Sequence, residues 1–262
     1  MYASNYLETA IINLMRGSAL ERPSALYVGL FLSDPTDTGT EGQEVVYPGY
    51  ARQSVTFEPN GINAIQNSEI ITFPEASTSV GSPITHIGIF DVLSGRTNMW
   101  LYGQLTTNLN IQANVAPIFR AGSMRWTMNG NMSNTYKQLI LNTIRRQNAS
   151  IAPFTPYIGM CSGDPNGSGV ELSGTDYARI PVTFAAPSSD SDAATATMTS
   201  NTTDISSPNP AGSYWGTWNY SGIYTAQTGG NLFMSVPLNS TFNMNEGSVG
   251  GFRAGKLTVS IN

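Results

Sequence analysis

Apolar side chains follow a helical spacing at the start of the chain and again near its middle. Between residues 6 and 15 they recur every three or four positions. Asn5 and Glu8 are spaced as in a capping box, and Gly17 is placed as a stop. A second stripe follows Ser133 and contains Tyr136, Leu139, Ile140 and Ile144. We predict two short helices, each packed on the domain that it begins; the alternative is a helix at an interface between subunits.

The remaining pattern predicts short strands. Runs rich in β-branched and aromatic residues are separated by turn signals such as Asp34-Pro35, Asn60-Gly61 and Ser94-Gly95. No helical pattern lies between these runs, which favours antiparallel sheets over parallel βαβ units. The expected strands are 25–32, 52–57, 69–73, 84–90, 99–105 and 123–128, then 157–162, 179–184, 194–199, 219–225, 231–236 and 256–261.

Four motifs occur twice, in the same order, about half a chain apart. They are Tyr27–Pro35 with Tyr157–Pro165, Tyr50-Ala51-Arg52 with Tyr177-Ala178-Arg179, Gly88-Ile89-Phe90 with Gly222-Ile223-Tyr224, and Phe119–Gly122 with Phe252–Gly255. Such self-similarity indicates a duplicated structural unit. We predict a mainly β protein of two tandem antiparallel domains, residues 1–130 and 131–262, each sandwich-like or barrel-like with one N-terminal helix. Polar segments between residues 188 and 210 predict longer loops in the second domain.

Charged residues are scarce, and this narrows the function classes. The chain has 262 residues, with 12 basic and 17 acidic side chains and a net charge of −5. Nucleic-acid binding needs a basic face, which this composition does not favour. No apolar run approaches the ~20 residues of a membrane span, and the first residues lack the basic segment and cleavage site of a signal peptide. We expect neither nucleic-acid nor membrane partners.

The residue types that carry most catalysis are nearly absent. His86 is the one histidine and lies in a predicted strand, so we interpret it as structural or as part of an interface. Cys161 cannot form an internal disulfide, and its apolar surroundings predict a small buried side chain. We therefore predict no catalytic residue and no enzyme activity.

The acidic residues indicate turns rather than a reactive or metal site. Asp34 and Asp164 precede prolines after strands, where an Asp side chain accepts hydrogen bonds from backbone amides. Asp190, Asp192 and Asp204 offer oxygen ligands for calcium, but their spacing matches no EF-hand loop. We expect no metal and no cofactor.

Repeated arginines and one aromatic cluster are the remaining candidates for a role. The arginines are Arg52 with Arg179, and Arg120 with Arg253. Each is expected to cover an aromatic ring or pair with a carboxylate in its own domain, or to contact another subunit. The aromatic cluster consists of Tyr214, Trp215, Trp218 and Tyr220. It is open to three interpretations: core packing, a protein contact, or a carbohydrate contact.

Several of these motifs together resemble a known family. The segments Tyr27–Phe31, Ser33-Asp34-Pro35, Gly49–Phe57 and Ile71–Pro74, with the strand 84–91, are similar to virion proteins of tailed bacteriophages that are labelled tail or tail-fibre proteins. The resemblance implies a structural role in the virion. It leaves the position open among tail, collar, fibre and capsid surface, and it implies no catalytic residues.

These observations lead to a structural hypothesis with two alternatives. We expect a virion component, assembled in the cytoplasm of the bacterial host, that associates symmetrically with itself and with other virion proteins. Three chains would present six similar domains, so a trimer or a ring compatible with sixfold symmetry is expected. The first alternative is a module that binds a host receptor or glycan through residues 214–220. The remote alternative is a polysaccharide depolymerase.

Overall fold

Both predicted helices are present, each capped by a serine. The structure is a computed structural model that describes residues 1–189, 197–210 and 214–261. Helix α1 (Asn5–Asn13) begins after Ser4, whose side chain accepts a hydrogen bond from the Leu7 amide, so Ser4 and not Asn5 is the cap. The short 3-10 turn η1 (Leu14–Arg16) then ends at Gly17, which has a φ of 93°. Helix α2 (Asn134–Ile144) is capped by Ser133 in the same way.

The first half contains three antiparallel sheets. The largest has the order β1-β8-β7-β2-β3, the second has the order β10-β5-β4, and β6 pairs with β9 in a two-stranded ribbon. The bounds are β1 Tyr2–Ala3, β2 Tyr27–Phe31, β3 Gln53–Ser54, β4 Phe57–Pro59, β5 Ala64–Asn67, β6 Ile71–Thr72, β7 Ile84–Phe90, β8 Met99–Leu109, β9 Ile118–Phe119 and β10 Arg125–Thr127.

The second half repeats this arrangement except for β1, in whose place Met132 forms only an isolated bridge with Met234 of β17. Its sheets have the orders β12-β11-β16-β17, β13-β14-β19 and β15-β18. The register agrees as well, because Gly29 pairs with Gly88 and Gly159 pairs with Gly222. The bounds are β11 Tyr157–Cys161, β12 Ile180–Pro181, β13 Ser188–Ser189, β14 Thr197–Ser200, β15 Ile205–Ser206, β16 Gly216–Tyr224, β17 Leu232–Met244, β18 Gly251–Phe252 and β19 Thr258–Ile261. The prediction of a mainly β, antiparallel, tandem fold is confirmed, and none of the described sheets closes into a barrel.

The loop prediction for the second half needs correction. The segment around Ile205 is no insertion, because β15 occupies the place of β6: Ile205 pairs with Phe252 as Ile71 pairs with Phe119. Residues 190–196, which include Asp190 and Asp192, lie outside the described residues.

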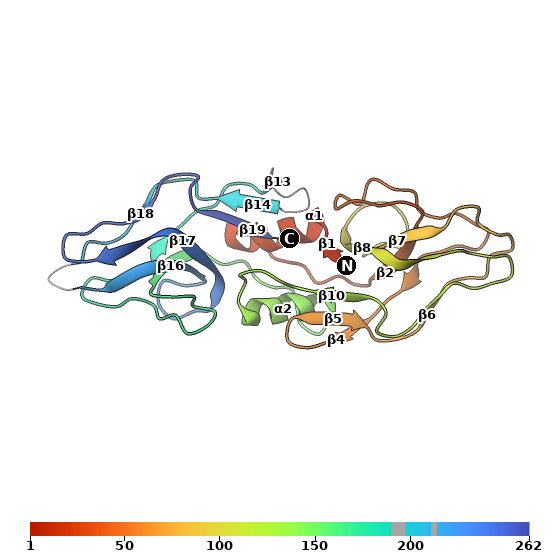
Figure 1. Cartoon of the computed structure of the whole chain (residues 1–262), viewed down its shortest axis with the longest axis horizontal. Coiled ribbons are helices and arrows are strands. Elements are labelled where there is room, and N and C mark those ends of the chain that lie inside the picture. Colours follow the sequence, from red (N-terminus) through yellow and green to blue (C-terminus); the bar gives the residue numbers. More distant parts are fainter. Residues whose placement is uncertain (190–196, 211–213, 262) are drawn as a thin grey trace.

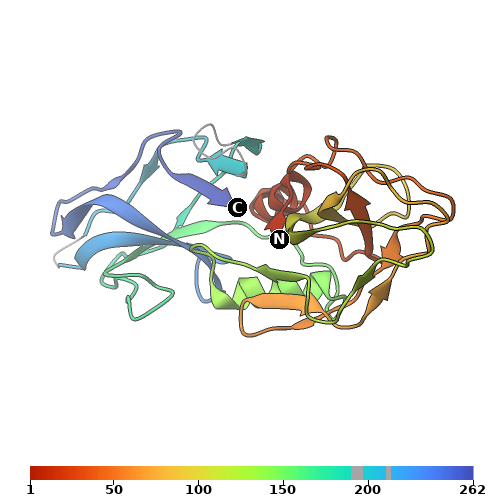
Figure 2. The same ribbon diagram turned by 45° about the vertical axis from the view of Figure 1, so that its right-hand side comes forward.

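Each helix packs on its own half, as the sequence predicts, and in addition contacts the other half, which the sequence does not predict. Helix α1 contacts β8 of its own half and also β14 and β19 of the other half. Helix α2 contacts β17 and lies beside β5 and β4 of the first half in both views (Figures 1 and 2). A short sheet must bury one face against another layer. Here each small sheet is covered by the helix from the other repeat.

The contacts across the junction are reciprocal. The Arg16 Nε donates to the Phe184 carbonyl at 3.3 Å, and the Arg145 Nε donates to the Phe57 carbonyl at the same distance. Leu20 and Ile151 exchange two backbone hydrogen bonds, of 3.0 and 2.9 Å. These matched pairs relate the halves by an approximate twofold axis.

The largest core cluster is continuous across this junction. It includes Leu7 and Ile11 of α1 together with Val259 and Ile261 of β19. No strand is shared between the halves in the described sheets. The boundary at residues 130 and 131 thus stays our proposed limit of the repeats, within one packed body. No described helix has the length and apolarity to cross a membrane.

Candidate functional site

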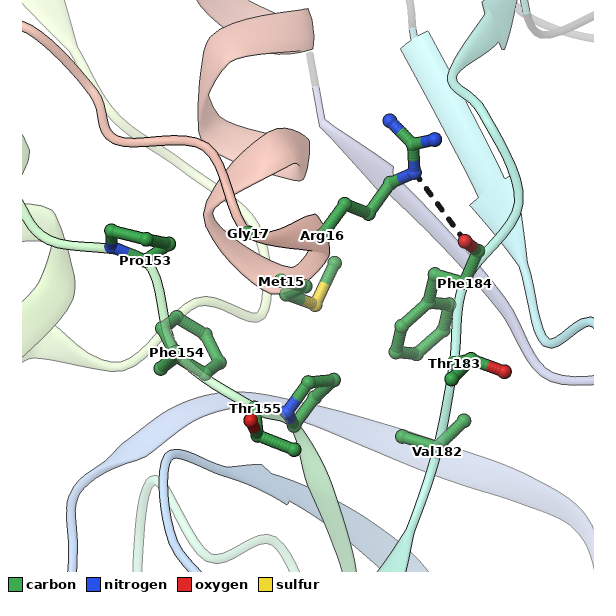
Figure 3. Close-up of a pocket in the computed structure, with 10 residues that line it drawn as sticks. Met15, Arg16, Gly17, Pro153, Phe154, Thr155, Val182, Thr183 and Phe184 are labelled. Carbon is green, nitrogen blue, oxygen red and sulfur yellow. Dashed lines mark hydrogen bonds between the residues drawn. The ribbon is translucent and has the colours of Figure 1, made fainter.

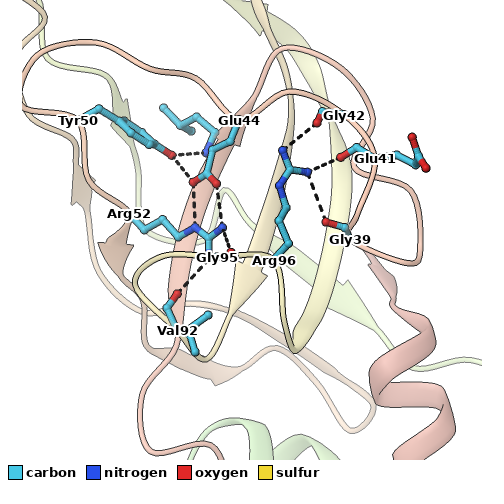
Figure 4. A network of polar contacts seen from close by, with 10 residues as sticks. Gly39, Glu41, Gly42, Glu44, Tyr50, Arg52, Val92, Gly95 and Arg96 are labelled. Atoms are coloured by element: carbon cyan, nitrogen blue, oxygen red, sulfur yellow. Dashed lines mark hydrogen bonds and ion pairs between the residues drawn. The ribbon is translucent and has the colours of Figure 1, made fainter.

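A buried arginine network joins two loops to the large sheet of the first half (Figure 4). Arg52, just before β3, donates from Nε and Nη2 to the two carboxylate oxygens of Glu44, both at 2.8 Å. Its guanidinium lies 3.7 Å from the centre of the Phe90 ring. Nη1 and Nη2 also donate to the carbonyls of Val92 (3.0 Å) and Gly95 (2.6 Å). Through Arg52, the loop after β7 is held to Glu44, which lies beside Phe31 of β2.

A tyrosine completes the network from the other side. The Tyr50 hydroxyl donates to Glu44 Oε1 at 2.9 Å and accepts from the Leu30 amide of β2 at 2.9 Å. Burial raises the pKa of Tyr50 well above its usual value, so the hydroxyl keeps its proton. Both oxygens of the Glu44 carboxylate are therefore occupied by donors of the same chain. The network therefore stabilises the fold, and neither Glu44 nor Tyr50 is free to act as an acid or base.

The second half contains the same network. Arg179 donates to both oxygens of Glu171 at 2.8 Å, Tyr177 donates to the same carboxylate at 2.8 Å, and the guanidinium lies 3.5 Å from the Tyr224 ring centre. Burial lowers the pKa of Arg179, but the hydrogen bond and charge of Glu171 outweigh it, so the pKa lies above its usual value. A Cβ at Gly159 would approach Glu171 to 2.8 Å, which explains the glycine in both repeats.

The other arginine pair lies on the surface. Arg120 is exposed just after β9, and Arg253 lies at the equivalent place after β18. Arg253 Nη1 is 3.9 Å from Asp204 Oδ2, and the two side chains are 88% and 63% exposed. The four arginines, which the sequence places in one group, thus form two: a buried structural pair and an exposed pair.

The aromatic cluster is mostly core. Trp215 and Trp218 are buried in a second apolar cluster with Met160, Leu172 and Met244. Their indole nitrogens donate to the Thr175 carbonyl (3.1 Å) and to Ser221 Oγ (3.3 Å). A partner or glycan has no access to these two rings, so their assignment to a recognition surface is wrong.

Only the ends of the aromatic cluster face outward. Tyr214 is 58% exposed, with its hydroxyl 2.9 Å from Thr217 Oγ1, and Tyr220 is half-buried. The register of β16 with β17 shifts between Trp218 and Tyr220, which pair with Phe242 and Pro237. Extra residues in β17 at this irregularity change which side chains share a face.

The single histidine and the single cysteine have structural surroundings. His86 is half-buried, with Nε2 3.8 Å from Asp34 Oδ2 and Nδ1 2.8 Å from Thr85 Oγ1. Cys161 is fully buried, and burial raises the pKa of its thiol to about 11, which keeps it protonated and unreactive.

The predicted turn carboxylates accept backbone hydrogen bonds. Asp34 Oδ1 accepts from the Thr36 amide at 2.8 Å, and Asp164 Oδ1 accepts from the Asn166 amide at 2.9 Å. Among the described residues no group of three or more His, Cys, Asp or Glu side chains is placed to hold a metal ion.

A cleft of about 480 Å³ lies at the junction of the halves (Figure 3). It is bounded by Met15 and Arg16 of η1, by Phe154, and by Val182 and Phe184. Arg16 is the one ionisable side chain among its lining residues. Acid–base catalysis needs a positioned proton donor or acceptor of suitable pKa, and this cleft offers apolar surface and a guanidinium instead.

The chain thus consists of two duplicated β modules, each stabilised by an internal arginine network. This organisation is typical of a structural protein. The family model described as "Podophage GP4 fiber I protein gp80" matches residues 2–127 and 131–260. The chain belongs to this family, and the resemblance to phage tail-fibre proteins is confirmed. The two matched segments coincide with the two structural repeats. A search of curated proteins finds no match.

The family is one of structural phage fibre proteins and not a known enzyme family. The chain is accordingly a structural component of a phage tail and of the virion, where it associates with other virion proteins. Sequence motifs alone are sufficient for this assignment, whereas the separation of buried from exposed arginines and tryptophans requires the structure.

Proposed function

We propose that the chain is a fibre-type tail protein that works by symmetric association of copies with one another and with neighbouring virion proteins. The observation that carries the proposal is the family match to both halves, residues 2–127 and 131–260. The low charge of the chain supports it, since charged residues are depleted in the cores of protein interfaces.

The test is to locate the chain in intact particles. A tagged full-length chain, expressed from the phage genome, is imaged by electron cryomicroscopy or by gold labelling of the tag. We expect label or added density at the tail in every particle, assembled before release from the host cytoplasm. Particles that lack the chain, or that hold it inside the capsid, would contradict the proposal.

Recognition of a host receptor or glycan is the second candidate, favoured by the exposed ring of Tyr214. An exposed aromatic ring stacks on sugars or anchors a protein partner. In this case Tyr214→Ala lowers adsorption to host cells at least tenfold while particles contain the normal amount of the chain. Equal adsorption of variant and wild-type particles would exclude this role for Tyr214. Thr228→Ala is the control, because Thr228 is exposed in the loop between β16 and β17, whereas Tyr214 precedes β16.

A further inference from the structure

The ribbon formed by β6 and β9 has one buried and one exposed face. Ile71 pairs with Phe119, and Thr72 pairs with Ile118. Ile71 is buried, and Phe119 packs edge-on against Phe73 with ring centres 6.1 Å apart. Side chains alternate along a strand, so the neighbours on the other face point outward. Ile70 and Ile118 are 65% and 55% exposed, and Thr72 and Arg120 are exposed beside them.

The duplicated ribbon provides an internal comparison. In β15–β18 the same register places Asp204 where the first half has Ile70, Ser206 at Thr72, Gly251 at Ile118, and Arg253 at Arg120. The arginine is kept, and both isoleucines are replaced. Asp204 pairs with Arg253, and its Oδ1 also accepts from the Ala254 amide at 2.8 Å. The outer face of this ribbon is polar, and its charges are balanced within the chain.

The first ribbon is not balanced in this way. Among the described residues no carboxylate forms an ion pair with Arg120. The outer face of this ribbon presents the branched apolar side chains of Ile70 and Ile118 beside the guanidinium of Arg120. Arginine is enriched in protein interfaces, and the buried core of an interface is more apolar than the rest of the surface. The backbone is the same in both ribbons, so the difference lies in what each outer face meets.

We propose that the outer face of β6–β9, made of Ile70, Thr72, Ile118 and Arg120, docks onto another virion protein that presents a carboxylate flanked by apolar side chains. The proposal rests on the proposed function as a tail component. The partner's carboxylate forms with Arg120 the ion pair that Asp204 forms with Arg253 within the chain. Burial of the two isoleucines removes apolar surface from water and so favours docking.

Charge repulsion argues against the same face of a second copy as the occupant, because a twofold contact through this face would bring two Arg120 side chains together. The β15–β18 ribbon of a copy fits poorly as well, because its outer positions, Asp204, Ser206, Gly251 and Arg253, offer no apolar side chain to Ile70 and Ile118. The labels β6 and β18 lie toward opposite ends of the molecule (Figure 1). Docking through one ribbon only therefore gives the chain a defined polarity in the tail.

The test gives the first ribbon the carboxylate of the second through Ile70→Asp, and reverses the charge of the first ribbon through Arg120→Glu. Ile70→Asp and Arg120→Glu are introduced separately into the phage genome, and the chain content of purified particles is measured by quantitative mass spectrometry. We expect at least a tenfold loss of incorporation for each variant. The melting temperatures of the purified full-length variants stay within 2 °C or so of wild type, since both positions are exposed. The matched control, Asp204→Ile, changes the equivalent position of the other ribbon and keeps normal incorporation.

The outcomes separate the docking proposal from the proposed function. Normal incorporation of Ile70→Asp and Arg120→Glu would overturn the docking proposal alone. A lower oligomer mass of pure Ile70→Asp in analytical ultracentrifugation would identify a second copy as the occupant and would also overturn it. Absence of the wild-type chain from particles would overturn both.

Discussion

Arg52 and Arg179 show at the residue scale why a chain with so few charges buries some of them. Each guanidinium binds a carboxylate bidentately, covers an aromatic ring and donates to loop carbonyls. Such a pair is costly to break from one side, because the remaining carboxylate loses its partners. The networks therefore specify where the loops lie relative to the sheet.

Removal of one arginine tests this interpretation. Arg52→Met leaves Glu44 without its ion pair in a largely buried site, so we expect a loss of about 3 kcal/mol in the free energy of unfolding. Urea denaturation followed by circular dichroism measures it. The control Arg120→Met, at an exposed position, is expected to change stability by less than about 0.5 kcal/mol. Equal effects of the two substitutions would contradict the structural role of Arg52.

Glu8 gives the fold a dependence on pH. Its side chain is fully buried on α1, and burial raises its pKa from an ordinary value of 4.5 to about 8. Between these two values the folded chain holds a proton that the unfolded chain has released. Stability is therefore expected to fall as pH rises through this window, by at most about 1.4 kcal/mol per pH unit.

The substitution Glu8→Gln removes the titrating group and keeps its shape. Urea unfolding at pH 6, 7, 8 and 9 is expected to show a declining stability for wild type and a flatter profile for the variant. The two curves diverge most above pH 8, where the folded wild type has also ionised. Parallel pH profiles would show that Glu8 is not the group responsible.

At the scale of elements, the contact of each helix with the other half is the main feature that the sequence does not predict. The hydrophobic spacing of α1 shows which of its sides is apolar, but it does not show which sheet covers that side. The contacts of α1 with β14 and β19 depend on how the two halves pack together, which no local pattern shows. In contrast, strands β2 and β11 are predicted at nearly their observed bounds, because both are apolar, bounded by turns and present twice.

Two further differences have local causes. The strand Ala64–Asn67 was not predicted, because Ala, Gln and Asn have low strand propensity and only its pairing with β4 and β10 makes it a strand. The burial of Trp218 follows from the irregular pairing of β16 with β17, which no alternation pattern reveals. The candidate site was therefore predicted by residue type and repetition, whereas its buried and exposed parts were not.

If α1 packs on β14 and β19, a substitution in α1 is expected to destabilise these strands of the second half. Ile11→Ala removes buried apolar volume from α1 and is expected to cost about 2–4 kcal/mol. Hydrogen–deuterium exchange should then accelerate in β14 and β19 as well as in β8. The exposed control Ile62→Ala leaves these amides unchanged. Faster exchange confined to residues 1–130 would contradict the packing of α1 on the second half.

At the scale of the whole molecule, the duplication has a consequence for symmetry. The two halves share topology and register and are related by an approximate twofold axis. A chain with two similar modules doubles the module number of any ring that it forms. Three copies thus present six similar modules, which suits a site of threefold or sixfold symmetry on a tail.

We propose that this chain builds a phage tail through symmetric association of duplicated modules. The most direct measurement is the number of chains in each assembly released from purified tails, determined by native mass spectrometry and checked against the density in intact particles. We expect three chains or a multiple of three. Assemblies of four or five chains, or a chain that stays monomeric in the tail, would contradict it.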